Sequence, residues 1–200
     1  MSGDITLQIL TGAAPALADR LGDLARLRLE IFRQYPYLYA GNLASETTYV
    51  RTYLQCPESL LVLALCGDAV VGMATALPLA FETEAVKAPF IAAGIDPARV
   101  FYCGESVLQP AYRRRGVYRQ FMAARENYAR SLGRFDRISM CAVVRPPDHP
   151  RRPAGYVSLD AVWDHFGYLP RPDLVASFEW QDLDEPAPTV KSMVFREKML

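Results

Sequence analysis

The sequence predicts one α/β domain with a mixed sheet, spanning residues 1–200. Three observations support this fold class. The 200 residues are enough to bury one sizeable core, and 51% of them are apolar. Short apolar runs typical of strands alternate with segments of helical period. No internal repeat or linker divides the chain.

The first half of the chain predicts a strand, two helices and a hairpin. After a short first strand, residues 14–35 carry apolar side chains every three or four positions, which predicts an amphipathic helix. A turn over residues 36–42 separates it from a second helix at about residues 43–55. Two apolar runs joined by Gly67-Asp68 then predict a hairpin over residues 59–80.

The middle of the chain predicts a long connection, a buried strand and a helix. Residues 81–99 mix helix and loop character and are longer than a strand connection needs, as functional segments often are. A buried strand over residues 100–108 ends before Pro110, which cannot donate to a ladder. The next helix runs from about Arg115 to Leu132, and Gly133 ends it.

The last third predicts three strands and one short helix. An apolar strand over residues 137–144 leads into a basic, proline-rich loop at residues 145–156. A short helix follows, with Ser158 as its N-cap. Two final strands, residues 174–183 and 190–199, complete the sheet, and their apolar character would allow a homodimer.

Composition and charge exclude several classes of protein. The 22 basic residues equal the 22 acidic ones, whereas a nucleic-acid binder needs excess positive charge to neutralise phosphates. No apolar window reaches the roughly 18 residues of a membrane span. The first ten residues show no signal-peptide pattern. We therefore expect a cytoplasmic protein without nucleic-acid or membrane partners.

The cysteines and histidines predict no metal site. The 4 cysteines form no CxxC pair, and three of them lie in apolar runs where reduced, buried thiols are usual. The 2 histidines lack a ligand spacing. An acetyl-cysteine intermediate on Cys103 or Cys141 is the lesser alternative, because neither thiol has a neighbouring base in the sequence.

The stretch from Leu108 to Met122 is the most unusual in the chain. A strand stops, three arginines follow, and Gly116 opens a helix. Cations oppose the helix dipole at an N-terminus, so their position favours binding of an anion over simple solvation of the helix end. Hydrogen bonds from the first backbone N–H groups would hold a phosphate, and the absence of a Cβ on glycine lets the backbone approach it. The pattern is neither a Walker A loop nor a Rossmann fingerprint.

At these residues the chain resembles the GCN5-related N-acetyltransferase (GNAT) superfamily, in a bacterial branch. The cofactor motif of that family, Arg/Gln-x-x-Gly-x-Gly/Ala, reads here from Arg113 to Tyr118. The order of elements matches over essentially the whole chain, including the pair Gly167-Tyr168 after the short helix. The resemblance implies a GNAT-like mixed, mostly antiparallel sheet flanked by helices, and acetyl-CoA as cosubstrate.

The resemblance also implies which residues bind the cofactor. Backbone N–H groups near Val107 and Leu108 would polarise the thioester carbonyl. The full set is Ser106, Val107, Leu108, Arg113, Arg114, Arg115, Gly116, Val117, Tyr118, Arg119 and Trp163.

Two positions depart from the family pattern. Tyr118 stands where the family prefers glycine or alanine, so its side chain must point away or reshape the pocket. Trp163 stands where the family often carries a tyrosine that protonates the departing thiolate. An indole N–H does not give up its proton, so the usual acid is missing or supplied elsewhere.

The catalytic candidates are Glu105, Tyr168 and Tyr156. Glu105 is the obvious carboxylate of its apolar strand and the candidate base, with a purely structural role as the alternative. By alternation it lies on the opposite face from Tyr102, unless a bulge intervenes. The two tyrosines are candidates for the missing acid.

Three functions compete at this stage. We expect an N-acetyltransferase that acts on a primary amine of a small molecule or peptide by direct attack. The substitution at Trp163 favours instead a non-catalytic acyl-CoA-binding or sensor module. A nucleic-acid binder that uses the arginine run is the weakest alternative, because the net charge is zero.

Overall fold

The computed structural model describes residues 4–12 and 14–200. It confirms the predicted fold class, because helices flank an 8-stranded, mostly antiparallel sheet. The strands are β1 (Ile5–Thr11), β2 (Leu60–Cys66), β3 (Ala69–Pro78), β4 (Val100–Tyr102), β5 (Ser106–Leu108), β6 (Arg137–Val143), β7 (Leu169–Trp180) and β8 (Thr189–Met199). The α-helices are α1 (Pro15–Phe32), α2 (Leu43–Val50), α3 (Thr52–Gln55), α4 (Glu84–Ala92), α5 (Val117–Ser131) and α6 (Asp160–His165).

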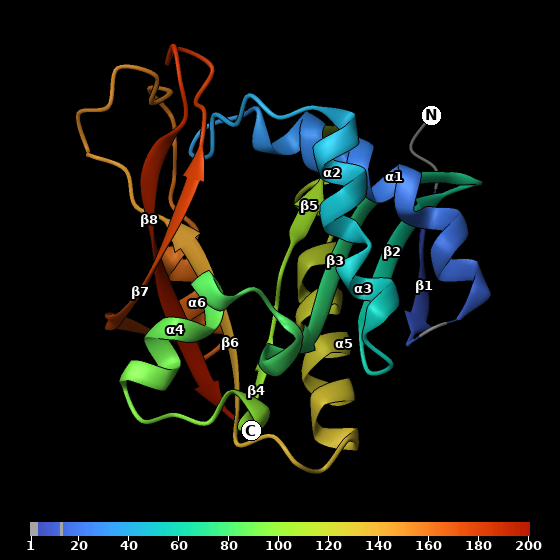
Figure 1. The fold of residues 1–200 in the computed structure, drawn as a ribbon. Coiled ribbons are helices and arrows are strands. Elements are labelled where there is room, and N and C mark those ends of the chain that lie inside the picture. The colour runs from blue at the N-terminus through green and yellow to red at the C-terminus, as the bar shows by residue number, and fades with distance from the viewer. Residues whose placement is uncertain (1–3, 13) are drawn as a thin grey trace.

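The strands follow the order β1-β2-β3-β4-β6-β8-β7. Within this sheet, β4 and β6 pair in parallel, and the other named pairs are antiparallel. In Figure 1, β1 to β3 and β5 form one wing of the sheet, and β6 to β8 form the other. The short strand β4 joins the two wings.

The strand expected over residues 100–108 is divided in two. Residues 103–105 separate β4 from β5, and we call them the strand break. β4 pairs with both β3 and β6, whereas β5 pairs with β3 alone among the described strands. β5 and β6 therefore diverge beyond the break, which Figure 1 shows above the label of β4.

Most other elements follow their predicted bounds, and the differences are local. The second helix is divided at Arg51 into α2 and α3. The short helix α6 begins at Asp160, so its N-cap is Leu159 and the prediction of Ser158 was wrong by one residue. The Asp160 N–H still donates to the Ser158 hydroxyl at 3.1 Å. β7 begins at Leu169, earlier than expected, because its pairing with β8 continues through an irregularity between Arg171 and Val175.

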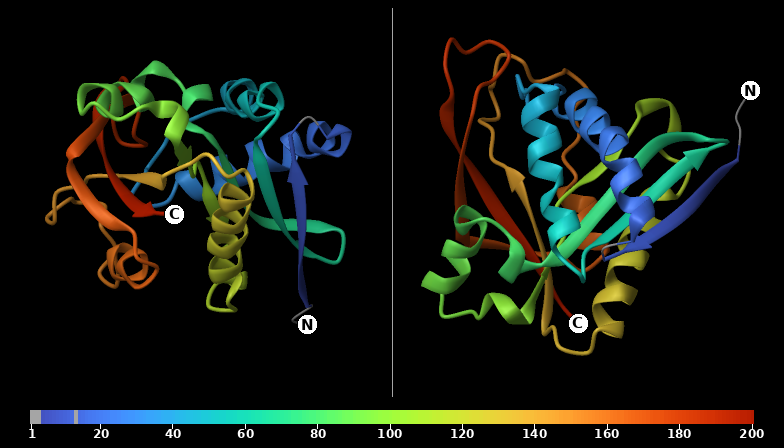
Figure 2. Two further views of the ribbon diagram at one scale, coloured as in Figure 1. Left: turned by 90° about the horizontal axis from the view of Figure 1, so that it is seen from below. Right: turned by 45° about the vertical axis from the view of Figure 1, so that its right-hand side comes forward.

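Two apolar clusters cover the two faces of the sheet. The first lies under α1, α3 and α4 and includes Leu24, Tyr53 and Phe90. The second lies under α5 and includes Phe121 and Tyr168. Figure 2 shows α5 and the helices α1 to α3 on opposite sides of the sheet. A single sheet thus separates two environments that meet at the strand break.

No helix in residues 4–12 and 14–200 has the length and apolar character needed to cross a membrane.

We predict that Gly104→Ala destabilises the protein, because the strand break has no room for a methyl group. A Cβ at this position would lie 2.3 Å from the Tyr53 hydroxyl oxygen and 2.9 Å from Thr75 Oγ1. Overpacking of this kind costs about 1–3 kcal/mol in free energy of unfolding. Urea unfolding measures the change.

Gly155→Ala is the matched control, since a Cβ there meets no described atom within 4 Å. Equal stability of the two variants would contradict the prediction.

Candidate active site

The strand break carries Glu105, and its carboxylate is held from three directions. The Tyr53 hydroxyl donates to Oε2 at 2.6 Å, and the Thr75 hydroxyl donates to the same oxygen. Arg28 of α1 forms an ion pair with Oε1. The Glu105 N–H in turn donates to Thr75 Oγ1 at 2.9 Å. These contacts fix the carboxylate in one place beside the strand break.

Arg28 joins two buried carboxylates. Its guanidinium pairs with Glu46 of α2 as well as with Glu105. Burial by itself lowers the pKa of Arg28, but the charges of Glu105 and Glu46 outweigh that effect and raise it. The same guanidinium stacks over the rings of Phe32 and Tyr49 at 4.9 and 4.3 Å. Arg28 therefore stays charged and holds α1, α2 and the strand break together.

A cavity of about 280 Å³ opens above this network. It lies on the α1 side of the sheet, between the two wings. Aromatic rings dominate its wall, and Arg28 is its one cation among the described lining residues. The lining residues are Arg28, Phe32, Tyr37, Tyr39, Ser45, Glu46, Tyr49, Val86, Tyr102, Gly104, Glu105, Cys141, Phe178, Glu179, Trp180 and Met193.

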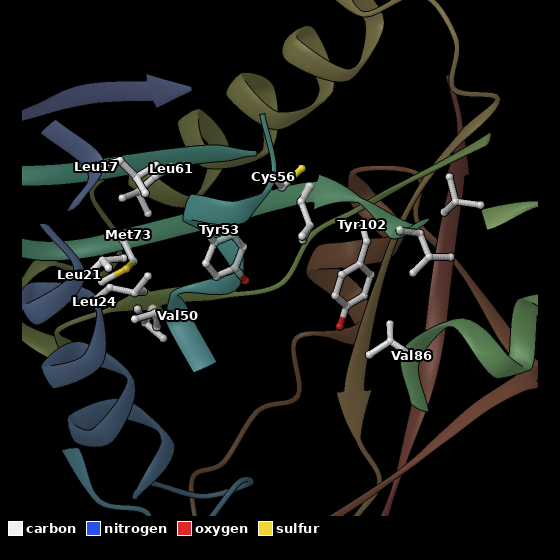
Figure 3. Packing of buried hydrophobic residues seen from close by; sticks show 14 of the residues in the cluster. Leu17, Leu21, Leu24, Val50, Tyr53, Cys56, Leu61, Met73, Val86 and Tyr102 are labelled. Atoms are coloured by element: carbon white, nitrogen blue, oxygen red, sulfur yellow. The ribbon is translucent and has the colours of Figure 1, made fainter. Parts of the chain in front are cut away.

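Figure 3 shows the buried apolar residues that pack in this region. Tyr53 and Tyr102 lie in the centre of the view, between the leucines of α1 on one side and Val86 of α4 on the other. Both rings are buried, and burial is the main cause that raises the pKa of each hydroxyl. These tyrosines thus remain protonated hydrogen-bond donors near neutral pH.

Glu82 is a buried carboxyl that the sequence analysis did not single out. It is 5% exposed, and the N–H of Thr83 donates to its Oε2 at 3.1 Å. Burial outweighs that hydrogen bond and raises the pKa of Glu82 to about 7. Tyr102 and Cys141 both line the cavity, and burial is the main cause that raises the pKa of each. The negative charge of Glu82 raises both pKa values further. A titrating carboxyl thus lies close to the cavity wall.

The free edge of β5 presents backbone N–H groups toward β6. The Thr75 N–H donates to the Glu105 carbonyl at 3.0 Å, and the Gln109 N–H donates to the Val71 carbonyl at 3.0 Å. Hydrogen-bonding direction alternates along an antiparallel pair. The N–H of Val107 therefore points at β3, contrary to the role that the resemblance implied for it. The N–H groups of Ser106 and Leu108 point away from β3 into the space where β5 and β6 diverge.

The arginine run lies at the N-terminus of α5, as predicted. Gly116 is the N-cap with a φ of +77°, in the left-handed region that glycine adopts without strain. Arg113, Arg114 and Arg115 are exposed. The first turn of α5 contains no acidic residue, and its N-cap supplies no side-chain acceptor. The unpaired N–H groups and the nearby cations fit the pyrophosphate of a coenzyme.

Tyr118 and Trp163, the two departures from the family pattern, contact each other. The indole N–H of Trp163 on α6 donates to the Tyr118 hydroxyl oxygen at 2.7 Å. Burial raises the pKa of Tyr118, whereas the nearby charge of Arg125 and the hydrogen bond from Trp163 act to lower it. Tyr118 thus packs between α5 and α6 instead of pointing away from the motif.

Arg125 is a buried cation next to this pair. It is 1% exposed, and its Nη1 donates to the Glu105 carbonyl at 3.2 Å. Its Nε has no hydrogen-bond partner among the described residues. The sequence signal was available, because Arg125 follows Val117 and Phe121 at four-residue spacing on the buried face of α5.

The two tyrosines proposed as acids lie in different surroundings. Tyr168 is fully buried in the core beneath α5, where its hydroxyl donates to Glu126 at 3.3 Å. Burial raises its pKa far above the usual range. Tyr156 is half-buried in the proline-rich loop, edge-on to Tyr35 with ring centroids 4.6 Å apart. Neither lines the cavity described above.

The basic, proline-rich loop and the two candidate cysteines also have defined surroundings. Arg145 forms a bidentate ion pair with Asp182, at 2.6 and 2.9 Å, and so anchors the proline-rich loop. Cys141 lines the cavity, but burial raises its pKa to about 12. Burial also raises the pKa of Cys103. Both thiols are therefore protonated near neutral pH, which disfavours an acetyl-cysteine intermediate.

Comparison with known proteins identifies the class. The model of the acetyltransferase (GNAT) family matches residues 24–154, which is more than half of the chain. No curated protein matches the chain significantly. The chain belongs to the acetyltransferase (GNAT) family, and it is an N-acetyltransferase whose chemistry is acyl transfer.

Solved structures show the same fold at low sequence identity. A putative acetyltransferase from Acinetobacter baylyi has a TM-score of 0.61 at 10% identity, covering 100% of this chain and 95% of its own. An N-acetyltransferase from Staphylococcus aureus has a TM-score of 0.59 at 10% identity, with coverages of 98% and 99%. An acetyltransferase from Thermus thermophilus has a TM-score of 0.53 at 16% identity, with coverages of 98% and 97%.

We predict that Glu82→Gln stabilises the protein at neutral and higher pH. The pKa of Glu82 is raised from 4.5 to about 7, so the folded protein retains a proton that the unfolded chain releases in that window. Its contribution to stability therefore falls as the pH rises through the window. Glutamine does not ionise. Above this pH window the free energy of unfolding of the variant should therefore exceed that of the native protein by about 3 kcal/mol.

Urea unfolding of both proteins at about pH 5 and about pH 8 tests this, since the difference should grow between the two. A difference that is independent of pH would contradict the assignment.

Proposed function

We propose that this protein transfers the acetyl group of acetyl-CoA to a primary amine of a small molecule with an apolar body. The cavity beside Glu105 carries this proposal. At about 280 Å³ it lies at the small end of ligand pockets, and aromatic residues are the largest group in its wall. Its lining includes one arginine and three glutamates, Glu46, Glu105 and Glu179. Excess negative charge and aromatic faces favour a cationic amine.

Cofactor and amine approach the strand break from opposite faces of the sheet. The open N-terminus of α5 would hold the pyrophosphate on one side. The space between β5 and β6 would receive the thioester, with the N–H groups of Ser106 and Leu108 toward its carbonyl oxygen. The amine would enter from the cavity on the α1 side. Glu105 lines that cavity with its side chain, and its backbone carbonyl faces Arg125 behind the sheet.

Glu105 is the base in this proposal. Deprotonation of an amine with the pKa of a lysine, about 10.4, costs about 5 kcal/mol near pH 7. An ionised carboxylate has about four acceptor sites, and Arg28, Tyr53 and Thr75 occupy three of them. The remaining site, on Oε1, can accept the proton of the ammonium group. Loss of that proton lets the nitrogen attack the thioester carbon directly.

The first test measures cofactor binding and turnover. Calorimetry should detect acetyl-CoA binding, and release of free coenzyme A should be faster with 2-phenylethylamine than with lysine or spermidine. Binding without turnover of any amine would identify a sensor module instead. Absence of acetyl-CoA binding would overturn the proposal altogether.

We predict that Gly116→Asp weakens acetyl-CoA binding by about tenfold or more, because it places a carboxylate beside the phosphates. Gly116→Asn is the matched control. Asparagine has the same shape, tolerates the φ of +77° comparably, and carries no charge. Calorimetric dissociation constants that are equal for the two variants would show that the phosphates bind elsewhere.

We also predict that Glu105→Gln lowers kcat by about 10²-fold or more without changing acetyl-CoA affinity. The deficit should shrink at higher pH, because a growing fraction of the amine is then neutral without a base. Initial rates across the pH range, with calorimetry as the control for folding, measure this. A deficit that stays constant with pH would assign Glu105 a positioning role.

A further inference from the structure

The strongest unassigned feature is the cluster of Tyr118, Trp163 and Arg125 behind the strand break. Tyr118 and Trp163 are 45 positions apart in sequence, yet their polar atoms lie 2.7 Å from each other. The contact joins the first turn of α5 to α6. Neither residue belongs to the network around Glu105, and the mechanism above leaves both without a role.

The direction of this hydrogen bond matters. An indole nitrogen can only donate, so the Tyr118 oxygen is the acceptor. The phenolic proton of Tyr118 therefore remains available for a different partner. A hydrogen bond received by the oxygen also favours the phenolate that forms when this proton leaves.

Arg125 is a cation, and a positive charge stabilises the phenolate that forms when Tyr118 gives up its proton. It is 1% exposed, and its guanidinium donates to the neutral Glu105 carbonyl and to the sulfur of Met122. Burial by itself lowers the pKa of Arg125, whereas a side-chain hydrogen bond with Tyr118 contributes to raising it. No carboxylate of the described residues pairs with it, and its Nε is unsatisfied. An unpaired buried cation is costly. The cost is offset when a negative charge develops nearby.

The position of the cluster is fixed by the strand break. Arg125 Nη1 reaches the backbone carbonyl of Glu105 at 3.2 Å, from the α5 face of the sheet. The Glu105 side chain contacts the cavity on the opposite face. An amine that attacks from the cavity side expels the thiolate toward the α5 face, where Tyr118 and Arg125 lie.

We propose that Tyr118 is the general acid of acetyl transfer, oriented by Trp163 and supported by the charge of Arg125. This inference rests on the proposed function. The amine nitrogen forms a bond to the acetyl carbon, the carbon–sulfur bond breaks, and its electron pair remains on sulfur. The Tyr118 O–H gives its proton to that sulfur and yields the free thiol. The attacking nitrogen loses a second proton as the amide forms. One of the two protons lost by the ammonium group returns through solvent to the Tyr118 oxygen, and the other leaves Glu105 for solvent, so the cycle closes.

The test begins with Tyr118→Phe, which removes the hydroxyl and keeps the ring. With 2-phenylethylamine as the acceptor, kcat should fall by about 10²-fold. The calorimetric dissociation constant for acetyl-CoA should be unchanged. Tyr128→Phe is the matched control, since it removes a phenolic hydroxyl from the same helix, and it should keep native kcat.

The double variant Tyr118→Phe/Trp163→Tyr separates a chemical role from a structural one. It returns a hydroxyl to the cluster from α6 in place of α5. We expect it to regain about tenfold or more of the lost kcat. Recovery of this kind requires the proton donor itself, because neither the original ring pair nor its hydrogen bond is restored.

Two outcomes would overturn the inference while leaving the proposed function intact. One is a Tyr118→Phe variant whose kcat stays within about threefold of native, and the other is a double variant no faster than the single one. A native protein that binds acetyl-CoA but acetylates no amine would overturn both proposals. The failures are therefore distinguishable.

Discussion

The ion pair between Arg28 and Glu105 is the constraint on which the rest of the site depends. One guanidinium pairs with two buried carboxylates, Glu105 in the strand break and Glu46 on α2. Removal of Arg28 would leave both carboxylates without a countercharge in the interior, which is far more costly than the net gain from forming such a pair. The network therefore fixes α1 and α2 against the strand break. Because Arg28, Glu46 and Glu105 all line the cavity, the network also fixes that part of the cavity lining.

Much of the fold follows from local signals in the sequence. The periodicity of α1, the Gly67-Asp68 hairpin and the glycine before α5 each act over a few residues, so each could be predicted. The surroundings of Glu105 in the strand break could not be predicted, because its partners Arg28, Tyr53 and Thr75 are distant in sequence and contact it through side chains. Strand alternation alone describes a regular ladder and contains no information about such partners.

The site shows the same division between local and distant signals. The arginine run and Gly116 were visible as an anion-binding pattern, because helix dipole and N–H geometry are properties of one helix end. Glu105 was visible as a carboxylate in an apolar strand, and the structure places it at the cavity wall. Glu82 was hidden in a segment without periodicity, and its character comes from burial by elements far along the chain.

The contact between Tyr118 and Trp163 has an evolutionary consequence. Because the indole donates to the phenol at 2.7 Å, a change at either position alone leaves a partly buried donor or acceptor without its partner. The two positions should therefore vary together among related chains. Sequences with a hydroxyl-bearing ring at the first position should carry tryptophan at the second, and those with glycine or alanine at the first should carry tyrosine at the second. A departure from the family motif at position 118 would then mark a lineage in which positions 118 and 163 changed together.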